Sequence, residues 1–228
     1  MQGYFLVADI LGFSDIIKDN NSNNQNPIIE KWVILVNKLT EEHGIKKFQL
    51  ISDSLLVGIG SENEDLDNLV SFSRKLLEEG LNNKFPIRGA ISYGEYEWGS
   101  LTYGKAVIEA FEFEKQQNWI GISINSLPVY KGQYNNLALY PVPKKSGFYG
   151  LYYAVIWEVP EFPSLLEKSN NLEKGKFFQH TQLDKLTNTI LYRNYLKLIS
   201  LENKPLTKFY GTHPLEKIET FIETLMPE

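Results

Sequence analysis

The amino-acid sequence predicts an α+β fold in which helices cover one face of a mostly antiparallel sheet. Apolar, strand-like stretches alternate with segments whose apolar residues recur at helical spacing, in the order strand, helix, strand, strand, helix, strand, helix. Two of the strand-like stretches are separated only by a turn-forming triplet, which indicates an antiparallel hairpin. With 228 residues, 43% of them hydrophobic, the chain is long enough and apolar enough to bury a core.

Two segments in the first quarter of the chain predict strands. Residues 3–10 (GYFLVADI) are apolar and aromatic, which predicts a buried strand, and Gly12 interrupts the run. Residues 47–59 (KFQLISDSLLVGI) predict two strands hinged at Ser52-Asp53-Ser54, because apolar β-forming residues flank three turn formers. Further strands are expected at residues 85–93, 137–142 and 152–159.

Helices are predicted from the spacing of apolar side chains. In residues 28–42 these side chains recur at helical spacing and so line one face of a helix. A short helix is also expected directly after Gly12, followed by a loop over the polar residues 19–26. The other helices are expected at residues 66–81, 105–117, 181–201 and 214–226. The last two would form an extension that packs on the core or on a partner subunit.

Composition limits the partners, the metal ligands and the location that can be expected for this protein. The net charge is −5 and the lysines are scattered, so a nucleic-acid polymer is not expected as a partner. The chain has no cysteine, so any metal must be bound by oxygen or histidine. No apolar run reaches the roughly 18 residues of a membrane helix, and the N-terminus has no signal-peptide pattern. We therefore expect a cytoplasmic protein without a membrane partner.

Two acids stand where strands end. Asp9 closes the first strand and Asp53 lies at the tip of the hairpin, so the two carboxylates would converge at one edge of a sheet that holds both elements. Two adjacent carboxylates repel unless a cation lies between them or one takes a proton. Mg²⁺ and Mn²⁺ prefer such oxygen ligands, and the backbone carbonyl of Ile10 could add another. Alternatively, Asp9 caps the following helix and Asp53 is an ordinary turn residue.

The residues after Asp9 are suited to an anion. Gly12, Phe13 and Ser14 would begin a helix whose unpaired backbone N–H groups face phosphate. Gly12 would let the backbone close around a triphosphate, and the Phe13 side chain would belong partly to the core and partly to the site.

Three segments together resemble the class III nucleotidyl cyclases. The resemblance covers roughly residues 3–125 and implies a ferredoxin-like catalytic core, a head-to-tail homodimer with composite active sites, and two Mg²⁺ or Mn²⁺ ions held by Asp9 and Asp53. The segments are ADILGFSDI, similar to the family's metal-binding element, FQLISDSLLVGI, similar to its acid-bearing hairpin, and PIRGAISYGEYEWGSLTYGKAVIEA, similar to its strand, glycine turn and helix.

Four positions depart from the pattern of the purine cyclases in this family. Ile108 and Glu112 stand where those enzymes place an Asn and an Arg, and neither could stabilise a transition-state phosphate. Gln49 stands where a purine-selecting Lys or Glu is common. Ser52 replaces a glycine, from which we expect a less tight hairpin turn. These departures fit either an inactive cyclase or a branch that uses another base.

Other segments are similar to the pyrimidine cyclases of bacterial Pycsar anti-phage systems. These segments are the pattern G-K-A-x-x-E-A-x-x-x-E at 104–114, YPVPKK at 140–145 and AVIW at 154–157. Gln49 offers both a donor and an acceptor, with which it could read a pyrimidine edge, or it points to solvent. The resemblance implies conversion of UTP to cyclic UMP, or of CTP to cyclic CMP, and a separate effector that responds to the product.

Three basic residues could contact the phosphates. Arg88 lies on a strand expected to be central, so it needs an anionic partner, which is either a phosphate or a neighbouring acid in a salt bridge. Lys144 and Lys145 follow two prolines on a loop and could reach a triphosphate, or they are merely solvated. We expect residues 1–160 to form the catalytic domain and residues 161–228 the helical extension.

Overall fold

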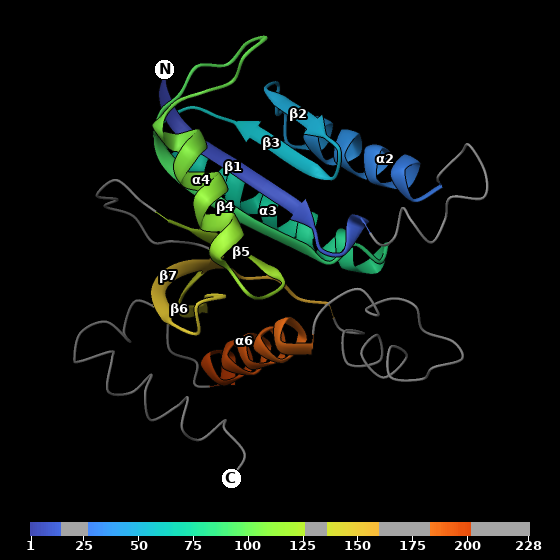
Figure 1. The fold of residues 1–228 in the computed structure, drawn as a ribbon, viewed down its shortest axis with the longest axis vertical. Coiled ribbons are helices and arrows are strands. Elements are labelled where there is room, and N and C mark those ends of the chain that lie inside the picture. The colour runs from blue at the N-terminus through green and yellow to red at the C-terminus, as the bar shows by residue number, and fades with distance from the viewer. Residues whose placement is uncertain (15–26, 126–135, 160–182, 202–228) are drawn as a thin grey trace.

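A computed structural model describes residues 1–14, 27–125, 136–159 and 183–201 of the chain (Figure 1). Its centre is one seven-stranded sheet with the strand order β2-β3-β1-β4-β5-β7-β6. The strands are β1 (Gln2–Ile10), β2 (Phe48–Ile51), β3 (Ser54–Gly58), β4 (Ile87–Glu95), β5 (Gly121–Ile124), β6 (Leu137–Pro143) and β7 (Tyr149–Val155). The helices are α2 (Pro27–Glu42), α3 (Asn63–Asn82), α4 (Lys105–Gln116) and α6 (Leu183–Leu201).

The sheet confirms the predicted α+β class and its mostly antiparallel pairing. Strand β1 pairs antiparallel with β3 on one side and with β4 on the other, while β4 and β5 form a parallel pair. Strand β5 was not predicted from the sequence. It has four residues, all buried, so it shows no alternation of apolar and polar side chains that would distinguish it.

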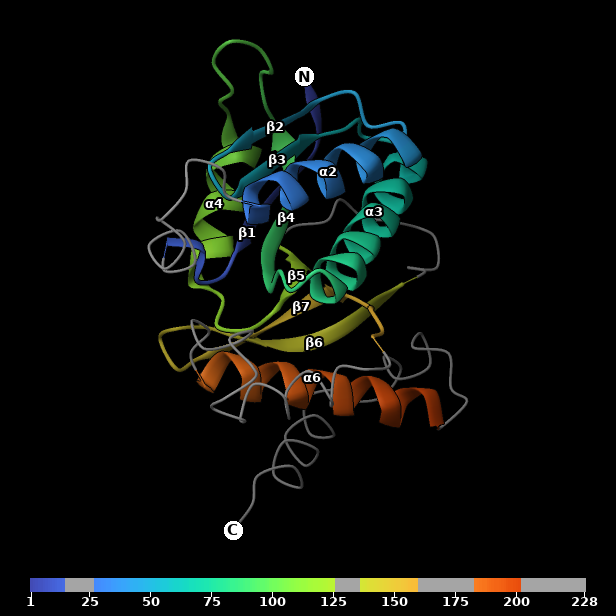
Figure 2. The ribbon, with the colours of Figure 1, turned by 90° about the vertical axis from the view of Figure 1, so that its right-hand side faces the viewer.

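Helices lie on both faces of the sheet, which corrects the expectation of one covered face. Side chains alternate along β1, so Leu6 and Ala8 enter the main core while Phe5 and Val7 enter a smaller cluster. The smaller cluster contains Ala106, Val107 and Ala110 of α4, whereas α2 and α3 contribute to the main core. Figure 2 shows α2 and α3 on one side of this part of the sheet and α4 on the other. The alternation in β1 therefore serves two helical layers.

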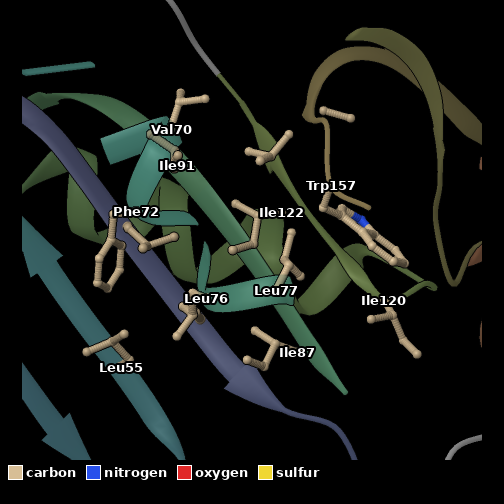
Figure 3. Packing of buried hydrophobic residues seen from close by; sticks show 14 of the residues in the cluster. Leu55, Val70, Phe72, Leu76, Leu77, Ile87, Ile91, Ile120, Ile122 and Trp157 are labelled. Atoms are coloured by element: carbon tan, nitrogen blue, oxygen red, sulfur yellow. The ribbon is translucent and has the colours of Figure 1, made fainter. Parts of the chain in front are cut away.

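The main core fixes the strands that carry the site. Leu76 and Leu77 of α3 are fully buried beside Ile87 and Ile122 of the sheet (Figure 3). Burial of a side chain of this size stabilises the fold by roughly 1.5–3 kcal/mol relative to exposure. Because Ile87 precedes Arg88 on β4, this packing holds the start of β4 in place against the end of β1.

Helix α6 packs on the core, one of the two arrangements expected for the C-terminal extension. Leu186, Tyr192 and Tyr195 are buried in the main cluster. The Tyr192 hydroxyl donates to the Val155 carbonyl at 2.8 Å, and the Tyr195 hydroxyl donates to the Leu139 carbonyl at 2.9 Å. These bonds tie α6 to both strands of the β6–β7 hairpin.

Some predicted segments lie outside the described residues. They are the rest of the short helix after Gly12, the loop at 19–26 and the helix at 214–226. Among the helices that the structure describes, none has the length and apolar character needed to cross a membrane.

Gly104, which precedes α4, provides a test of the close contact between this helix and β4. Its φ is +135°, and a Cβ there would lie 2.5 Å from the Glu95 carbonyl oxygen. We expect Gly104→Ala to lower the free energy of unfolding by roughly 3 kcal/mol or more, because strain and backbone overlap add. Urea unfolding monitored by circular dichroism measures this.

Gly147→Ala is the matched control. Gly147 also has a positive φ, +81°, but a Cβ added at this residue would have no other atom within 4 Å. Its substitution should therefore cost only the left-handed conformational penalty of about 1–2 kcal/mol. Equal losses in the two variants would show that α4 and β4 are not in tight contact at Gly104.

Candidate active site

The carboxyl groups of Asp9 and Asp53 meet at one end of the sheet, as their positions in the sequence predict. Asp9 lies near the end of β1, and Asp53 lies in the turn that leads into the neighbouring strand β3. The two side chains share a hydrogen bond. Burial is the largest cause that raises the pKa of Asp9, to about 8, followed by the hydrogen bond to Asp53 and its charge; Arg88 opposes the shift. One proton is therefore held between the two acids when no cation is present.

The turn that carries Asp53 is tighter than expected from its serine. Ile51 and Ser54 are paired, so only Ser52 and Asp53 connect β2 to β3. A two-residue hairpin needs positive φ, which glycine adopts easily. Ser52 adopts it instead, with φ of +59°, so the replacement of glycine introduces backbone strain and does not loosen the turn.

The donor set at this pair fits a hard divalent ion. Two carboxyl groups that share a proton can exchange it for a cation, and both offer oxygen ligands to Mg²⁺ or Mn²⁺. The Ile10 side chain is a hydrocarbon without a donor atom, so only the backbone carbonyl of that residue could be a ligand. Within the described part of the chain, no group of three or more His, Asp or Glu side chains forms a metal site. The remaining ligands would therefore be phosphate oxygens and water.

Arg88 is held by acids, which is the salt-bridge alternative considered from the sequence. It lies opposite Asp9 in the β1–β4 register and is buried. Its guanidinium forms a salt bridge with the buried Glu114 of α4, and its Nη2 lies 3.8 Å from Asp9 Oδ2. Arg88 therefore lies between two acids, where it positions Asp9, and its predicted contact with phosphate stays a prediction.

Glu114 and Gln117 were not identified as site residues from the sequence. Gln117 is buried; its Nε2 donates to the Gly89 carbonyl at 2.9 Å, and its Oε1 accepts from Trp119 and Ser123. Its backbone carbonyl accepts a longer bond from Arg88, at 3.4 Å. The network ties the end of α4 to β4 and β5. The requirement of a buried Arg88 for an anionic partner was the only signal in the sequence for Glu114.

The two lysines of the β6–β7 turn have different surroundings. The Lys144 ammonium donates to the Tyr152 hydroxyl at 3.0 Å and lies over the rings of Tyr152 and Phe113. Lys145 lies close enough to Asp9 and Glu114 for the charges of both acids to raise its pKa. Burial, the largest effect, and the charge of Arg88 outweigh them, so its pKa is lowered. Of the two lysines, Lys145 is thus the one placed beside the acids.

The other predicted positions have distinct surroundings. Gly12 has φ of +81° at the turn after β1, and a helix begins at Phe13 and Ser14. The Phe13 side chain belongs to the main core, and Ser14 is exposed. Gln49 is exposed on β2, which is an edge strand of the sheet. Ile108 and Glu112 are exposed on α4.

The raised pKa of Asp9 predicts a pH dependence of stability. A carboxyl whose pKa is higher in the folded protein stabilises the fold fully below its unfolded value, near 3.8, and loses this contribution as the pH rises through about 8. Without divalent ions, we expect stability to fall between pH 4 and 8 by on the order of 1 kcal/mol per pH unit relative to Asp9→Asn. Urea unfolding of both proteins across this range measures the difference; parallel pH profiles would contradict it.

Solved structures with nucleotide cyclase domains share this fold. No protein-family model and no curated protein sequence matches the chain. The guanylate cyclase domain of RhGC from Catenaria anguillulae, in complex with GTP, is 18% identical, with a TM-score of 0.52 over 68% of this chain and 96% of that one. The non-canonical dimeric guanylyl cyclase domain of RhoGC from Blastocladiella emersonii is 18% identical, with a TM-score of 0.55 over 67% and 94%. The chain therefore has the fold of the class III nucleotidyl cyclase domains, with about a third of its length outside the match.

Proposed function

We propose that this protein is a nucleotidyl cyclase that converts UTP to 3′,5′-cyclic UMP and pyrophosphate. The observation that carries the proposal is the contact between the Asp9 and Asp53 carboxyl groups at the end of β1. Support comes from the fold, which is shared with a guanylate cyclase domain solved with GTP. Residues 1–160 would form the catalytic unit, and residues 161–228 its extension.

The reaction requires alignment and charge neutralisation more than covalent chemistry by the protein. The ribose 3′-oxygen forms a bond to the α-phosphorus, its proton passes to solvent, and the bond from the α-phosphorus to the bridging oxygen breaks. The electron pair of that bond leaves with pyrophosphate. The backbone N–H groups at Gly12, Phe13 and Ser14 would face the phosphates at the start of the helix.

Asp9 and Asp53, with the Ile10 carbonyl, would hold two Mg²⁺ or Mn²⁺ ions. Such ions neutralise phosphate charge and lower the pKa of the attacking hydroxyl. The chain's own contribution is to keep both carboxylates in place. Arg88 does this for Asp9 by its position between Asp9 and Glu114.

A homodimer with composite sites would explain the exposed position of Gln49. On the edge strand β2, its side chain faces away from its own core and could reach a nucleotide bound to the acids of a partner subunit. A Gln side chain can both donate to and accept from a pyrimidine edge. Cyclic CMP is accordingly the alternative product. The similarity to Pycsar enzymes supports a signalling role in anti-phage defence through a separate effector.

A catalytically silent nucleotide-binding module is the second candidate. The observation that favours it is the surface of α4, where Ile108 and Glu112 are exposed at positions that hold Asn and Arg in the purine cyclases. Neither can donate a charged hydrogen bond to a phosphate. Tight, metal-dependent nucleotide binding without a cyclic product would identify this case.

The test of the proposal is a product assay with each of the four nucleoside triphosphates and Mn²⁺. We expect cyclic UMP as the main product, detected by mass spectrometry, and a fall of at least about 100-fold in Asp9→Asn and Asp53→Asn because the metal ligands are weakened. Glu41→Gln, an exposed acid on α2, should retain full activity. Absence of a cyclic product from every nucleotide would refute the cyclase, and active Asp53→Asn would refute the role of the pair.

Gln49 should determine the choice of base. We expect Gln49→Ala to reduce the ratio of kcat/KM for UTP over that for CTP by roughly tenfold, the loss associated with one or two hydrogen bonds. Thermal stability should be unchanged because the side chain is exposed. Steady-state kinetics with both nucleotides measures the ratio; an unaltered ratio would mean that Gln49 only faces solvent.

A further inference from the structure

Helix α6 carries Lys185 in its first turn, where the helix is attached to the segment that follows α4. Asn118 Nδ2 donates to Asp184 Oδ2 at 2.6 Å, and Asn188 Nδ2 donates to the Asn118 carbonyl at 2.8 Å. The backbone N–H of Ile120 donates to Thr189 Oγ1 at 2.9 Å. Three hydrogen bonds therefore fix the first two turns of α6, on either side of Lys185, to residues 118–120.

The same segment anchors the β6–β7 turn. The Lys145 N–H donates to the Gln116 carbonyl at 2.8 Å, and the Asn118 N–H donates to the Pro143 carbonyl, also at 2.8 Å. Arg88 donates to the carbonyl of Gln117, which lies between these two anchors. Arg88, Lys145 and the start of α6 are thus connected to one short segment, residues 116–120.

These attachments bring three cations together beside the acids. Arg88 lowers the pKa of both Lys145 and Lys185, and Lys185 also lowers that of Lys145, although burial is the largest cause for each lysine. Asp9 and Glu114 act on Lys145 in the opposite direction. The three cations therefore lie within electrostatic reach of one another, and Arg88 and Lys145 also lie within reach of Asp9 and Glu114.

The cations differ in what they already bind. Arg88 is engaged by Glu114, and Asp9 with Asp53 would be engaged by divalent ions. Neither Lys145 nor Lys185 forms a salt bridge with any described residue. Two partly desolvated ammonium groups held near each other and near Arg88 repel, and an anion with several charges would relieve this repulsion.

We infer that Lys185 of α6 and Lys145 form a phosphate-binding pair that contacts the β- and γ-phosphates in the same subunit as the Asp9–Asp53 pair. This inference rests on the proposed function for the identity of the nucleotide. It gives α6 a role in the site and supplies positive charge for the departing pyrophosphate, which α4 lacks at Ile108 and Glu112.

Inorganic tripolyphosphate is the direct probe, because it has the phosphates without the base or ribose. Its binding in the presence of Mg²⁺ is measured by titration calorimetry on the full chain. We expect Lys185→Gln and Lys145→Gln each to weaken binding by roughly tenfold or more, the scale of one lost charge-assisted hydrogen bond. Lys185→Arg should restore most of the affinity, whereas UMP, which lacks the outer phosphates, should bind equally to all variants.

Lys31→Gln is the matched control, an exposed lysine on α2 whose loss changes the net charge by the same amount. An equal loss of affinity in Lys31→Gln and Lys185→Gln would overturn the inference, as would unchanged binding in Lys185→Gln or no binding of tripolyphosphate by the wild type. Should Lys185→Gln lower thermal stability, Lys145→Gln, at an exposed position, provides the same test.

Activity separates this inference from the proposed function. Cyclic product from the wild type with unaltered kcat and KM in both lysine variants would refute the lysine pair and leave the cyclase standing. Lysine-dependent binding of tripolyphosphate without a cyclic product from any nucleotide would refute the cyclase and leave the phosphate site standing. For an active cyclase, we expect Lys185→Gln to lower kcat and raise KM for UTP.

Discussion

The approach of two carboxyl groups that repel when both are ionised is the constraint on which the site depends. Asp9 and Asp53 are brought together because β1 and β3 are neighbours and because a two-residue turn leaves Asp53 no freedom to move away. The cost of this contact is met by packing elsewhere, in the apolar clusters on both faces of β1. A site that is unfavourable by itself is thus stable only within this sheet, and a divalent ion or a proton removes the repulsion.

Charges of alternating sign continue behind the pair. Arg88 lies beside Asp9, and the buried Glu114 lies beside Arg88. Each ionised group therefore has a partner of opposite sign on an adjacent element. Removal of one member would leave an uncompensated buried charge, which is costly. The end of α4 belongs to the same arrangement through Gln117, which fills the hydrogen-bonding needs of β4, β5 and Trp119. The acids, the sheet and α4 are therefore joined by one continuous set of ion pairs and hydrogen bonds.

Patterns of neighbouring residues in the sequence predicted those parts of the fold that depend on local structure. The hairpin, the position of Asp53 at its tip and the long helices follow from turn residues and apolar spacing within a few positions of each other. Strand β5 and the placement of α4 on the opposite face did not, since a four-residue buried strand has no periodicity and a helix does not specify which face of a sheet it covers. The partner of Arg88 shows the same limit within the site. The need of a buried arginine for an anion could be stated from the sequence, but Glu114 lies 26 positions away and its role requires the register of α4 against β4.

The place of β1 in the sheet has a consequence for how the chain folds as it is made. Strand β1 leaves the ribosome before the two strands that flank it, β3 and β4, and its pairing with β4 joins Gln2 to Glu95. The apolar residues of β1 consequently lack part of their neighbours until the chain has been synthesised through α4, which covers Phe5 and Val7. Contacts so distant in sequence slow folding and leave apolar surface open to other chains in the meantime. The extent to which the apolar surface of β1 is shielded from other chains during synthesis, as well as the stability of the folded protein, should therefore determine how much soluble protein accumulates.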